Sequence, residues 1–139
     1  MATRKAGCFL LDCKNKRIAL VHREKQNDYS FPKGHVESGE DIIEAAIRET
    51  AEETKRIALV LEEFEPHIEE YVTPLGEECI CYMFIAIDQG KSDNDSTDTH
   101  DVVWIPFDSV EETLTYPSLK QSWRDVKETI FKIINDYKD

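Results

Sequence analysis

Three glutamates lie close together in the stretch RETAEETK at residues 48–55. On a helix, Glu49, Glu52 and Glu53 would project from one face, because residues three and four apart are neighbours on a helix surface. Like charges at this spacing repel one another, and a divalent cation bound between them would remove the repulsion. Magnesium and manganese prefer carboxylate oxygens, so the spacing is compatible with a metal site. A solvated acidic face is the alternative.

The residues before these glutamates shape the backbone beside them. FPKGHVESGE, residues 31–40, contains a proline and two glycines, which predicts an irregular loop. From Asp41 onward apolar residues recur at three- and four-residue spacing, which predicts an amphipathic helix to about Thr54. The loop therefore brings backbone groups and the Glu40 carboxylate next to the acidic face, where Arg48 can hold a carboxylate with its guanidinium.

This arrangement resembles the signature of the Nudix hydrolase family, GX5EX7REUXEEXGU, in which U is apolar and X is any residue. The matching stretch, called the Nudix box below, is GHVESGEDIIEAAIRETAEETKR, residues 34–56. The positions that carry the resemblance are Gly34, Glu40, Arg48, Glu49, Glu52 and Glu53. The resemblance implies an α+β Nudix-type fold, with a mixed β-sheet core sandwiched by α-helices, over a single domain at residues 1–139.

The resemblance also implies roles for these residues. Magnesium or manganese would be bound by Glu49, Glu52 and Glu53. The backbone carbonyl of Lys33 would be a further ligand, Glu40 would brace the loop or bind a second metal, and Arg48 would orient Glu49. The implied reaction is hydrolysis of a nucleoside diphosphate linked to another group, in which water attacks phosphorus while cations neutralise the developing charge. The expected catalytic residues include Arg48, Glu49 and Glu52.

Three positions depart from the signature: Thr50 and Arg56 replace apolar residues, and Lys55 replaces the glycine. A lysine adopts positive φ only at a cost of about 1 kcal/mol. We therefore expect the chemistry to be kept and the helix exit to be altered, so that the helix runs on or ends with a different turn.

Other candidates lie outside the signature. In many family members an acid from a facing loop acts as base or extra ligand, and Asp98 or Asp101 could fill that role, with a solvated loop as the alternative. Arg23, Lys33 and Tyr82 are candidates for binding distal phosphates or a base, with Tyr71 and Tyr116 as further aromatic candidates. A basic surface strand and packing of the aromatic rings in the core are the alternatives.

The loop FPKGHVESGE resembles the diadenosine and diphosphoinositol polyphosphate hydrolase branches of the family more than the branch that removes mutagenic nucleotides. The leading hypothesis is a metal-dependent hydrolase of a dinucleoside polyphosphate such as diadenosine tetraphosphate. A second hypothesis changes the substrate to ADP-ribose, a nucleoside triphosphate, a capped RNA 5′ end or an inositol pyrophosphate. A third is a Nudix-fold regulator that binds a nucleotide without cutting it.

The remaining elements are predicted from apolar patterning. A hairpin is expected from the runs at 6–12 and 17–24, and a short extended piece at 35–37. A second hairpin is expected from 57–72 and 78–88, with Pro66 interrupting or edging its first strand. A short strand at 102–107 and a short and a longer helix within 108–137 complete the pattern, and the longer helix is expected to pack on the sheet.

Composition limits the partners. The 17 basic and 29 acidic side chains give a net charge of -12, which disfavours long nucleic acid and anionic membranes. No run approaches the roughly 20 apolar residues of a membrane span, and the first residues lack a secretion signal, so a cytoplasmic location is expected. A small-molecule nucleotide is the expected partner, with the chain a monomer or homodimer. The four cysteines lack CxxC spacing, and we expect reduced, buried thiols rather than a zinc site.

Overall fold

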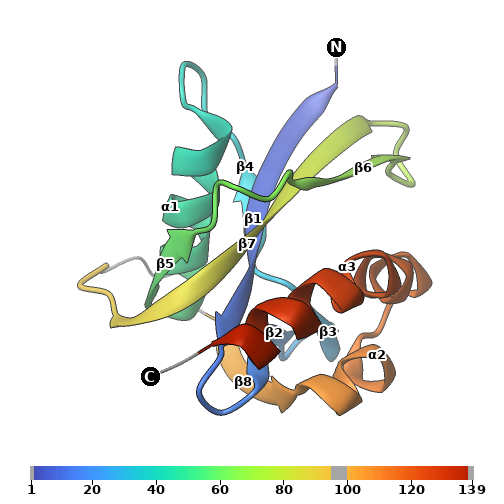
Figure 1. The fold of residues 1–139 in the computed structure, drawn as a ribbon. Coiled ribbons are helices and arrows are strands. Elements are labelled where there is room, and N and C mark those ends of the chain that lie inside the picture. Colours follow the sequence, from blue (N-terminus) through green and yellow to red (C-terminus); the bar gives the residue numbers. More distant parts are fainter. Residues whose placement is uncertain (1, 95–99, 138–139) are drawn as a thin grey trace.

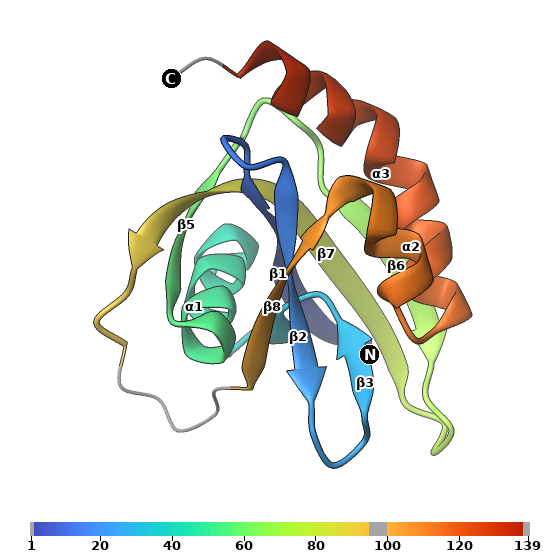
Figure 2. The ribbon, with the colours of Figure 1, turned by 90° about the horizontal axis from the view of Figure 1, so that it is seen from below.

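The computed structural model describes residues 2–94 and 100–137. These residues form an eight-stranded sheet with helices on both faces (Figures 1 and 2). The strands are β1 (Thr3–Asp12), β2 (Arg17–Arg23), β3 (Asp28–Ser30), β4 (Lys33–His35), β5 (Arg56–Val60), β6 (His67–Val72), β7 (Glu78–Lys91) and β8 (Asp101–Pro106). The helices are α1 (Ile42–Thr54), η1 (Phe107–Ser109), α2 (Val110–Thr113) and α3 (Pro117–Asp136).

The sheet is mixed. Its centre is the parallel pair β1 and β7, which runs in register from Thr3 opposite Cys79 to Leu11 opposite Ile87. The other pairings are antiparallel, and the strand order along the main path is β3-β2-β1-β7-β5. The strand β4 pairs with the start of β1, whereas β2 pairs with its end. This confirms the predicted α+β fold with a mixed sheet between helices.

Helix α1 covers one face of the sheet through small side chains. The buried Ala45 and Ala46 pack with apolar residues of β1, β5 and β7, among them Phe84. Asp41 caps the helix, since its carboxylate accepts hydrogen bonds from the backbone N–H groups of Ile43 and Glu44. Because alanines allow close approach, α1 lies close to the sheet. Glu49 and Glu53 follow Ala45 at four-residue spacing, so these two glutamates lie on the sheet-facing side of the helix.

Helix α3 covers the other face and forms the larger apolar cluster. Its buried side chains include Trp123, Ile130 and Ile134, which pack with residues of β1 and β7 such as Phe9 and Met83. The predicted hairpin of the first two strands, the last strand and the two final helices are confirmed. The structural interpretation of the last helix is confirmed as well.

The second predicted hairpin is confirmed between β6 and β7, and its first stretch is interrupted, as expected at Pro66. The stretch at 57–72 forms two separate strands, because a turn at Leu61–Phe64 and Pro66 divide it. β6 then pairs with the first half of β7 and β5 with its second half. The short strand of the glycine loop is Lys33–His35 rather than 35–37.

The predicted alteration of the helix exit is also wrong. Helix α1 ends at Thr54, and Lys55 itself adopts the left-handed conformation, with φ 61°. Its backbone N–H donates to the carbonyl of Ala51, and its Nζ donates to the carbonyl of Asn94 at 2.9 Å. Arg56 begins β5 and forms a bidentate pair with Asp88. Lysine therefore occupies the backbone conformation that the family's glycine would take.

All four cysteines are buried and free, as predicted. Burial raises the pKa of the Cys8 thiol to about 12, so this thiol stays protonated and unreactive at neutral pH. Over residues 2–94 and 100–137, the helices include none with the length and apolar character needed to cross a membrane.

Candidate functional site

A cavity of about 910 Å³ opens beside helix α1. One wall consists of α1 and β4, a second of β2, β3 and the start of α3, and a third of β6. Two of the box glutamates, Glu49 and Glu53, face into it. The cationic side chains in its lining are Lys5, Arg23 and Lys33, together with His35 and His100 if they are protonated. Anionic and cationic groups thus line the same space.

Gly34 lies directly against the carboxylate of Glu49. A Cβ atom at Gly34 would lie 2.0 Å from Oε2 of Glu49. The strand β4 is held in place by antiparallel pairing with β1, where Gly34 opposes Ala6. The first glycine of the box is therefore required for close approach of a side chain to the backbone.

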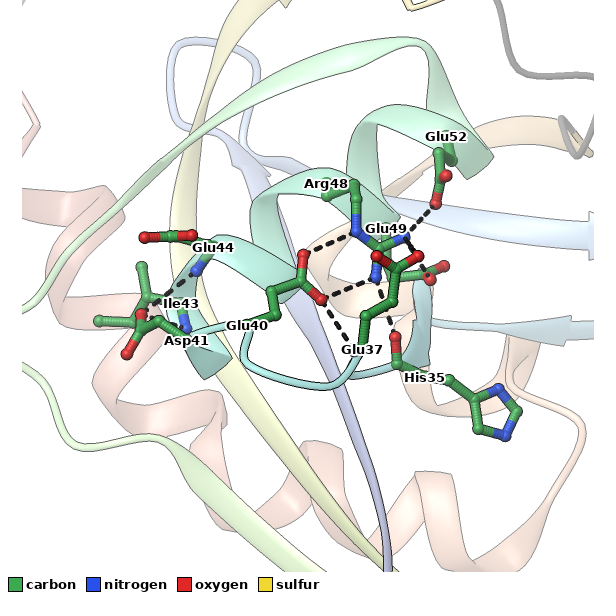
Figure 3. Close-up of polar contacts among 9 residues, drawn as sticks. All are labelled: His35, Glu37, Glu40, Asp41, Ile43, Glu44, Arg48, Glu49 and Glu52. Atoms are coloured by element: carbon green, nitrogen blue, oxygen red, sulfur yellow. Dashed lines mark hydrogen bonds and ion pairs between the residues drawn. The ribbon is translucent and has the colours of Figure 1, made fainter.

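Arg48 links the box carboxylates (Figure 3). Its Nε donates to Glu40 at 2.7 Å, and its Nη1 donates to Glu49 at 2.9 Å and to Glu52 at 2.7 Å. Its Nη2 donates to the backbone carbonyl of His35 at 2.9 Å. One guanidinium group thus fixes carboxylates on the helix and on the preceding loop.

Glu40 shapes the loop. Its carboxylate accepts the backbone N–H of Glu37 at 3.0 Å, and the N–H of Glu40 donates to the Glu37 carbonyl at 3.0 Å. The hydrogen bonds from Arg48 lower the pKa of Glu40. Glu40 and Glu52 do not line the cavity. Both accept hydrogen bonds from Arg48.

Glu53 is the most strongly perturbed carboxyl group of the site. Burial raises its pKa to about 7, and repulsion from Glu49 acts in the same direction. Its Oε1 accepts the backbone N–H of Lys33 at 2.8 Å, and its Oε2 lies 3.9 Å from Nε2 of His100. Burial also raises the pKa of Glu49, although Arg48 opposes that effect.

The donor chemistry of this wall fits a hard divalent cation. Glu49 and Glu53 repel each other in a partly buried position, and a cation there would offset both the repulsion and the desolvation. In the part of the chain that the structure describes, no three acidic, histidine or cysteine side chains already surround one point. Arg48 donates hydrogen bonds to the carboxylates of both Glu49 and Glu52 in this structure.

The predicted substrate residues lie in different places. Arg23 and Lys33 line the cavity, and the Lys33 Nζ lies 6.0 Å from the centre of the Tyr71 ring. Tyr82 packs against the apolar cluster between α1 and the sheet and does not line the cavity. The tyrosines in the cavity lining are Tyr71 and Tyr116.

The predicted loop acids are not both described. Asp98 lies outside the described residues. Asp101 begins β8 opposite His22, with an exposed carboxylate 3.9 Å from Nδ1 of His22, and it does not line the cavity.

Three residues near the predicted site were not assigned a role from sequence. Lys5 lies in β1, Asp28 begins β3, and His100 directly precedes β8. Asp28 pairs with Arg23, and Lys5 and His100 line the cavity. Tyr29, a strand residue next to Asp28, stacks on His22 outside the cavity lining. The sequence signal for Asp28 is only its position five residues after Arg23.

Comparisons with known proteins identify the family of this chain. Residues 1–126 match the NUDIX domain family. The chain is 34% identical over 101 residues to an 8-oxo-(d)GTP phosphatase of Mycolicibacterium smegmatis, a match over 72% of this chain and 30% of that protein. The chain thus spans less than a third of the length of this relative.

Solved structures share the fold. A NUDIX hydrolase from Nitrosomonas europaea superposes with a TM-score of 0.76 at 20% identity, over 93% of this chain and 90% of that chain. A C. elegans Ap4A hydrolase in a binary complex gives a TM-score of 0.76 at 20% identity, over 94% of this chain and 99% of that chain. Because the NUDIX domain family matches residues 1–126, which is most of the chain, this chain belongs to the Nudix hydrolase family.

Proposed function

We propose that the protein is a divalent-metal-dependent hydrolase of dinucleoside polyphosphates, with diadenosine tetraphosphate as the representative substrate. The observation that carries this proposal is the cavity itself. It presents Glu49, Glu53 and Lys33 on the wall formed by α1 and β4, and Arg23 and Lys5 elsewhere in its lining. A phosphate chain bridged to the glutamates by cations, and contacted by the basic side chains, matches that distribution of charge.

Nudix hydrolases generally use divalent metals. In this chain Glu49, Glu52 and Glu53 would hold them, together with the Lys33 carbonyl. Bound there, the cations would polarise the attacking water and neutralise charge that develops on the phosphate oxygens. Glu40 is the alternative ligand for a second cation.

The other residues orient these groups. Arg48 fixes the rotamers of Glu49 and Glu52 by direct hydrogen bonds, which limits the conformational freedom lost when a substrate binds. The backbone N–H of Lys33 holds Glu53 in the cavity, and Glu40 fixes the turn between β4 and α1. Asp101 or Asp98 is proposed as the further acid. Asp101 follows the cavity-lining His100, and its exposed position at the start of β8 leaves its carboxylate accessible to solvent.

A nucleoside triphosphate is the second candidate substrate, because the M. smegmatis relative is an 8-oxo-(d)GTP phosphatase. The loop FPKGHVESGE and the fold shared with the Ap4A hydrolase favour the dinucleoside polyphosphate. A regulator that binds without cutting is disfavoured by the complete set of box glutamates. A cytoplasmic location and a monomeric or homodimeric state remain predictions.

The test is turnover of a substrate panel with magnesium or manganese and with a chelator, with products identified by mass. The panel holds diadenosine tetraphosphate, 8-oxo-dGTP, ADP-ribose and an inositol pyrophosphate. We expect chelator-sensitive conversion of diadenosine tetraphosphate to ATP and AMP at the highest kcat/KM. Preferred cleavage of 8-oxo-dGTP would replace the proposal with the second candidate, and no cleavage of any member would favour the regulator.

A further inference from the structure

Arg23, on the β2 wall of the cavity, is held by a buried carboxylate. Its Nε donates to Oδ1 of Asp28 at 2.8 Å, and its Nη2 donates to Oδ2 of the same residue. The two residues oppose each other across the antiparallel pair of β2 and β3. Asp28 is 1% exposed, whereas the Arg23 side chain is 39% exposed and lines the cavity. The pair thus has a buried acceptor and an accessible cation.

Tyr116 completes the arrangement from another element. Its hydroxyl donates to Oδ2 of Asp28 at 2.5 Å, from the position just before helix α3. The neighbouring residue Thr115 is tied to β3 by two hydrogen bonds with Tyr29, one in each direction, at 2.8 and 3.3 Å. The Asp28 carboxylate is therefore fixed by the β2–β3 hairpin and by the start of α3 together.

Asp28 engages only one side of the guanidinium group. Asp28 engages Nε and Nη2, so it does not use Nη1 and the two N–H donors there. A phosphate oxygen is a suitable acceptor for those donors, since arginine binds phosphate with planar, directed hydrogen bonds. The cavity that Arg23 lines also contains Glu49 and Glu53, the carboxylates expected to hold cations and phosphate.

Stability alone does not account for this pair. Replacement of a buried ion pair by apolar residues of similar size is often neutral or stabilising, because desolvation opposes the attraction. A positioning role is a better account. Arg23 lowers the pKa of Glu53 through its charge, so it lies within electrostatic range of that carboxylate. A guanidinium released from Asp28 would turn toward Glu53 and Glu49 and compete with cations for them.

We propose that Asp28 and Tyr116 are positioning residues that hold Arg23 away from the glutamates and aim its Nη1 at the phosphate chain of the substrate. The proposal rests on the proposed function for the kind of substrate, a nucleoside polyphosphate. It adds two residues that the box does not contain. It also makes the length of phosphate chain that the cavity accepts depend on the junction of β2, β3 and α3.

The test is binding of inorganic tripolyphosphate, in the presence of magnesium, measured by titration calorimetry. The variants are Arg23→Lys, Asp28→Asn and Tyr116→Phe. The matched control is Asp88→Asn, because Asp88 accepts from Nε and Nη2 of Arg56 in the same bidentate way and does not line the cavity. We expect affinity to fall about 10-fold or more for Arg23→Lys and Asp28→Asn and about 3-fold for Tyr116→Phe, with no change for the control.

The same variants are assayed with the substrate that the wild type cleaves fastest. The expected pattern is a raised KM with kcat within about 3-fold of the wild type, because the arginine binds the chain without contacting the reacting water. If Asp28→Asn does not fold, Tyr116→Phe keeps the test decisive. Tyr116 is 42% exposed, so loss of its hydroxyl group leaves the core unchanged.

Equal tripolyphosphate affinity in the wild type, Arg23→Lys and Tyr116→Phe would overturn the proposal, as would a wild type that does not bind tripolyphosphate. Failure of the proposed function has a different signature. The wild type would then bind tripolyphosphate with the expected order of variants and yet cleave no dinucleoside polyphosphate.

Discussion

Glu53 is kept in a position that opposes its own charge. Its side chain is 19% exposed, and burial and the nearby Glu49 both favour its protonated form. A structural role would be served better by a neutral side chain of the same shape. The arrangement is typical of functional sites, where a group is held in a state that only a ligand stabilises.

The first prediction concerns catalysis by Glu53. We expect Glu53→Gln to lower kcat by about 100-fold or more, because loss of a metal ligand removes transition-state stabilisation worth several kcal/mol. Glu44→Gln is the matched control, since Glu44 lies on the same helix and is exposed outside the cavity lining. Steady-state kinetics measure both variants. A kcat for Glu53→Gln within 3-fold of that of Glu44→Gln would exclude Glu53 from catalysis.

The second prediction concerns pH. The folded-state pKa of Glu53 is raised to about 7 from the ordinary 4.5, mainly by burial. The unfolded chain therefore ionises first, so the contribution of Glu53 to stability is full below about pH 4.5 and is lost between pH 4.5 and 7. In metal-free protein we expect Glu53→Gln to become more stable relative to the wild type as pH rises through that interval. Chemical denaturation at pH 5 and pH 8 measures the difference, and an equal difference at both values would contradict it.

The third prediction concerns the contact of Gly34 with Glu49. A methyl group at Gly34 would displace the carboxylate, because its Cβ would lie 2.0 Å from Oε2. We expect Gly34→Ala to lower kcat by about 100-fold, as misplacement of a catalytic group by about 1 Å does. The double variant Gly34→Ala, Glu49→Ala should be no slower than Glu49→Ala alone, because both changes remove the same interaction. Additive losses in kcat would show that Gly34 acts independently of Glu49.

At the scale of elements, helix α1 and its exit decide where the glutamates lie. The helix ends in a left-handed residue although that residue is a lysine, and the Lys55 side chain bonds to Asn94. The family signature is thus fulfilled by backbone conformation at a position where the residue type departs from it.

The fourth prediction follows from this exit. We expect Lys55→Gly to raise the free energy of unfolding by up to about 1 kcal/mol, because glycine adopts positive φ without the steric cost of a Cβ. Lys16→Gly, at φ 54° in the β1–β2 turn, is the matched control and should stabilise the fold similarly. Urea denaturation measures both. A destabilised Lys55→Gly beside a stabilised Lys16→Gly would show that the bond to Asn94 outweighs the backbone strain.

Elements with a strong local pattern could be predicted from sequence. Helix α1 was predicted from apolar spacing after Asp41, and the capping and bounds agree with it. An interruption of 57–72 was expected at Pro66. The separate pairing of β5 and β6 with the two halves of β7 was not predicted, because it depends on contacts that local patterns do not encode. The parallel pairing of β1 with β7 joins residues far apart in the chain, which local patterns do not encode.

The residues of the candidate site also divide into those that the sequence predicts and those that it does not. The box residues are recognisable because their spacing is fixed within one loop and one helix. The contacts of Arg23 with Asp28 and Tyr116 are set by the packing of a hairpin against helix α3, and Tyr116 is distant from Arg23 in sequence. The side of the sheet that Tyr82 faces follows from strand parity only once its partner strands are known.

At the scale of the whole molecule, charge is distributed unevenly. The chain carries a net charge of -12, yet the cavity collects Lys5, Arg23 and Lys33 in its walls. An anionic substrate is repelled at long range and attracted only within the cavity, where cations held by the glutamates would add to the basic side chains. This distribution favours a small polyphosphate over a long nucleic acid.

A cation site formed by Glu49 and Glu53 is tested most directly by manganese binding to metal-free protein, measured by calorimetry at neutral pH with Glu53→Gln and Glu44→Gln alongside. We expect binding that magnesium displaces, that Glu53→Gln weakens at least about 10-fold, and that Glu44→Gln leaves unchanged. Absent binding, or equal binding in the wild type and Glu53→Gln, would contradict a cation site on this wall of the cavity.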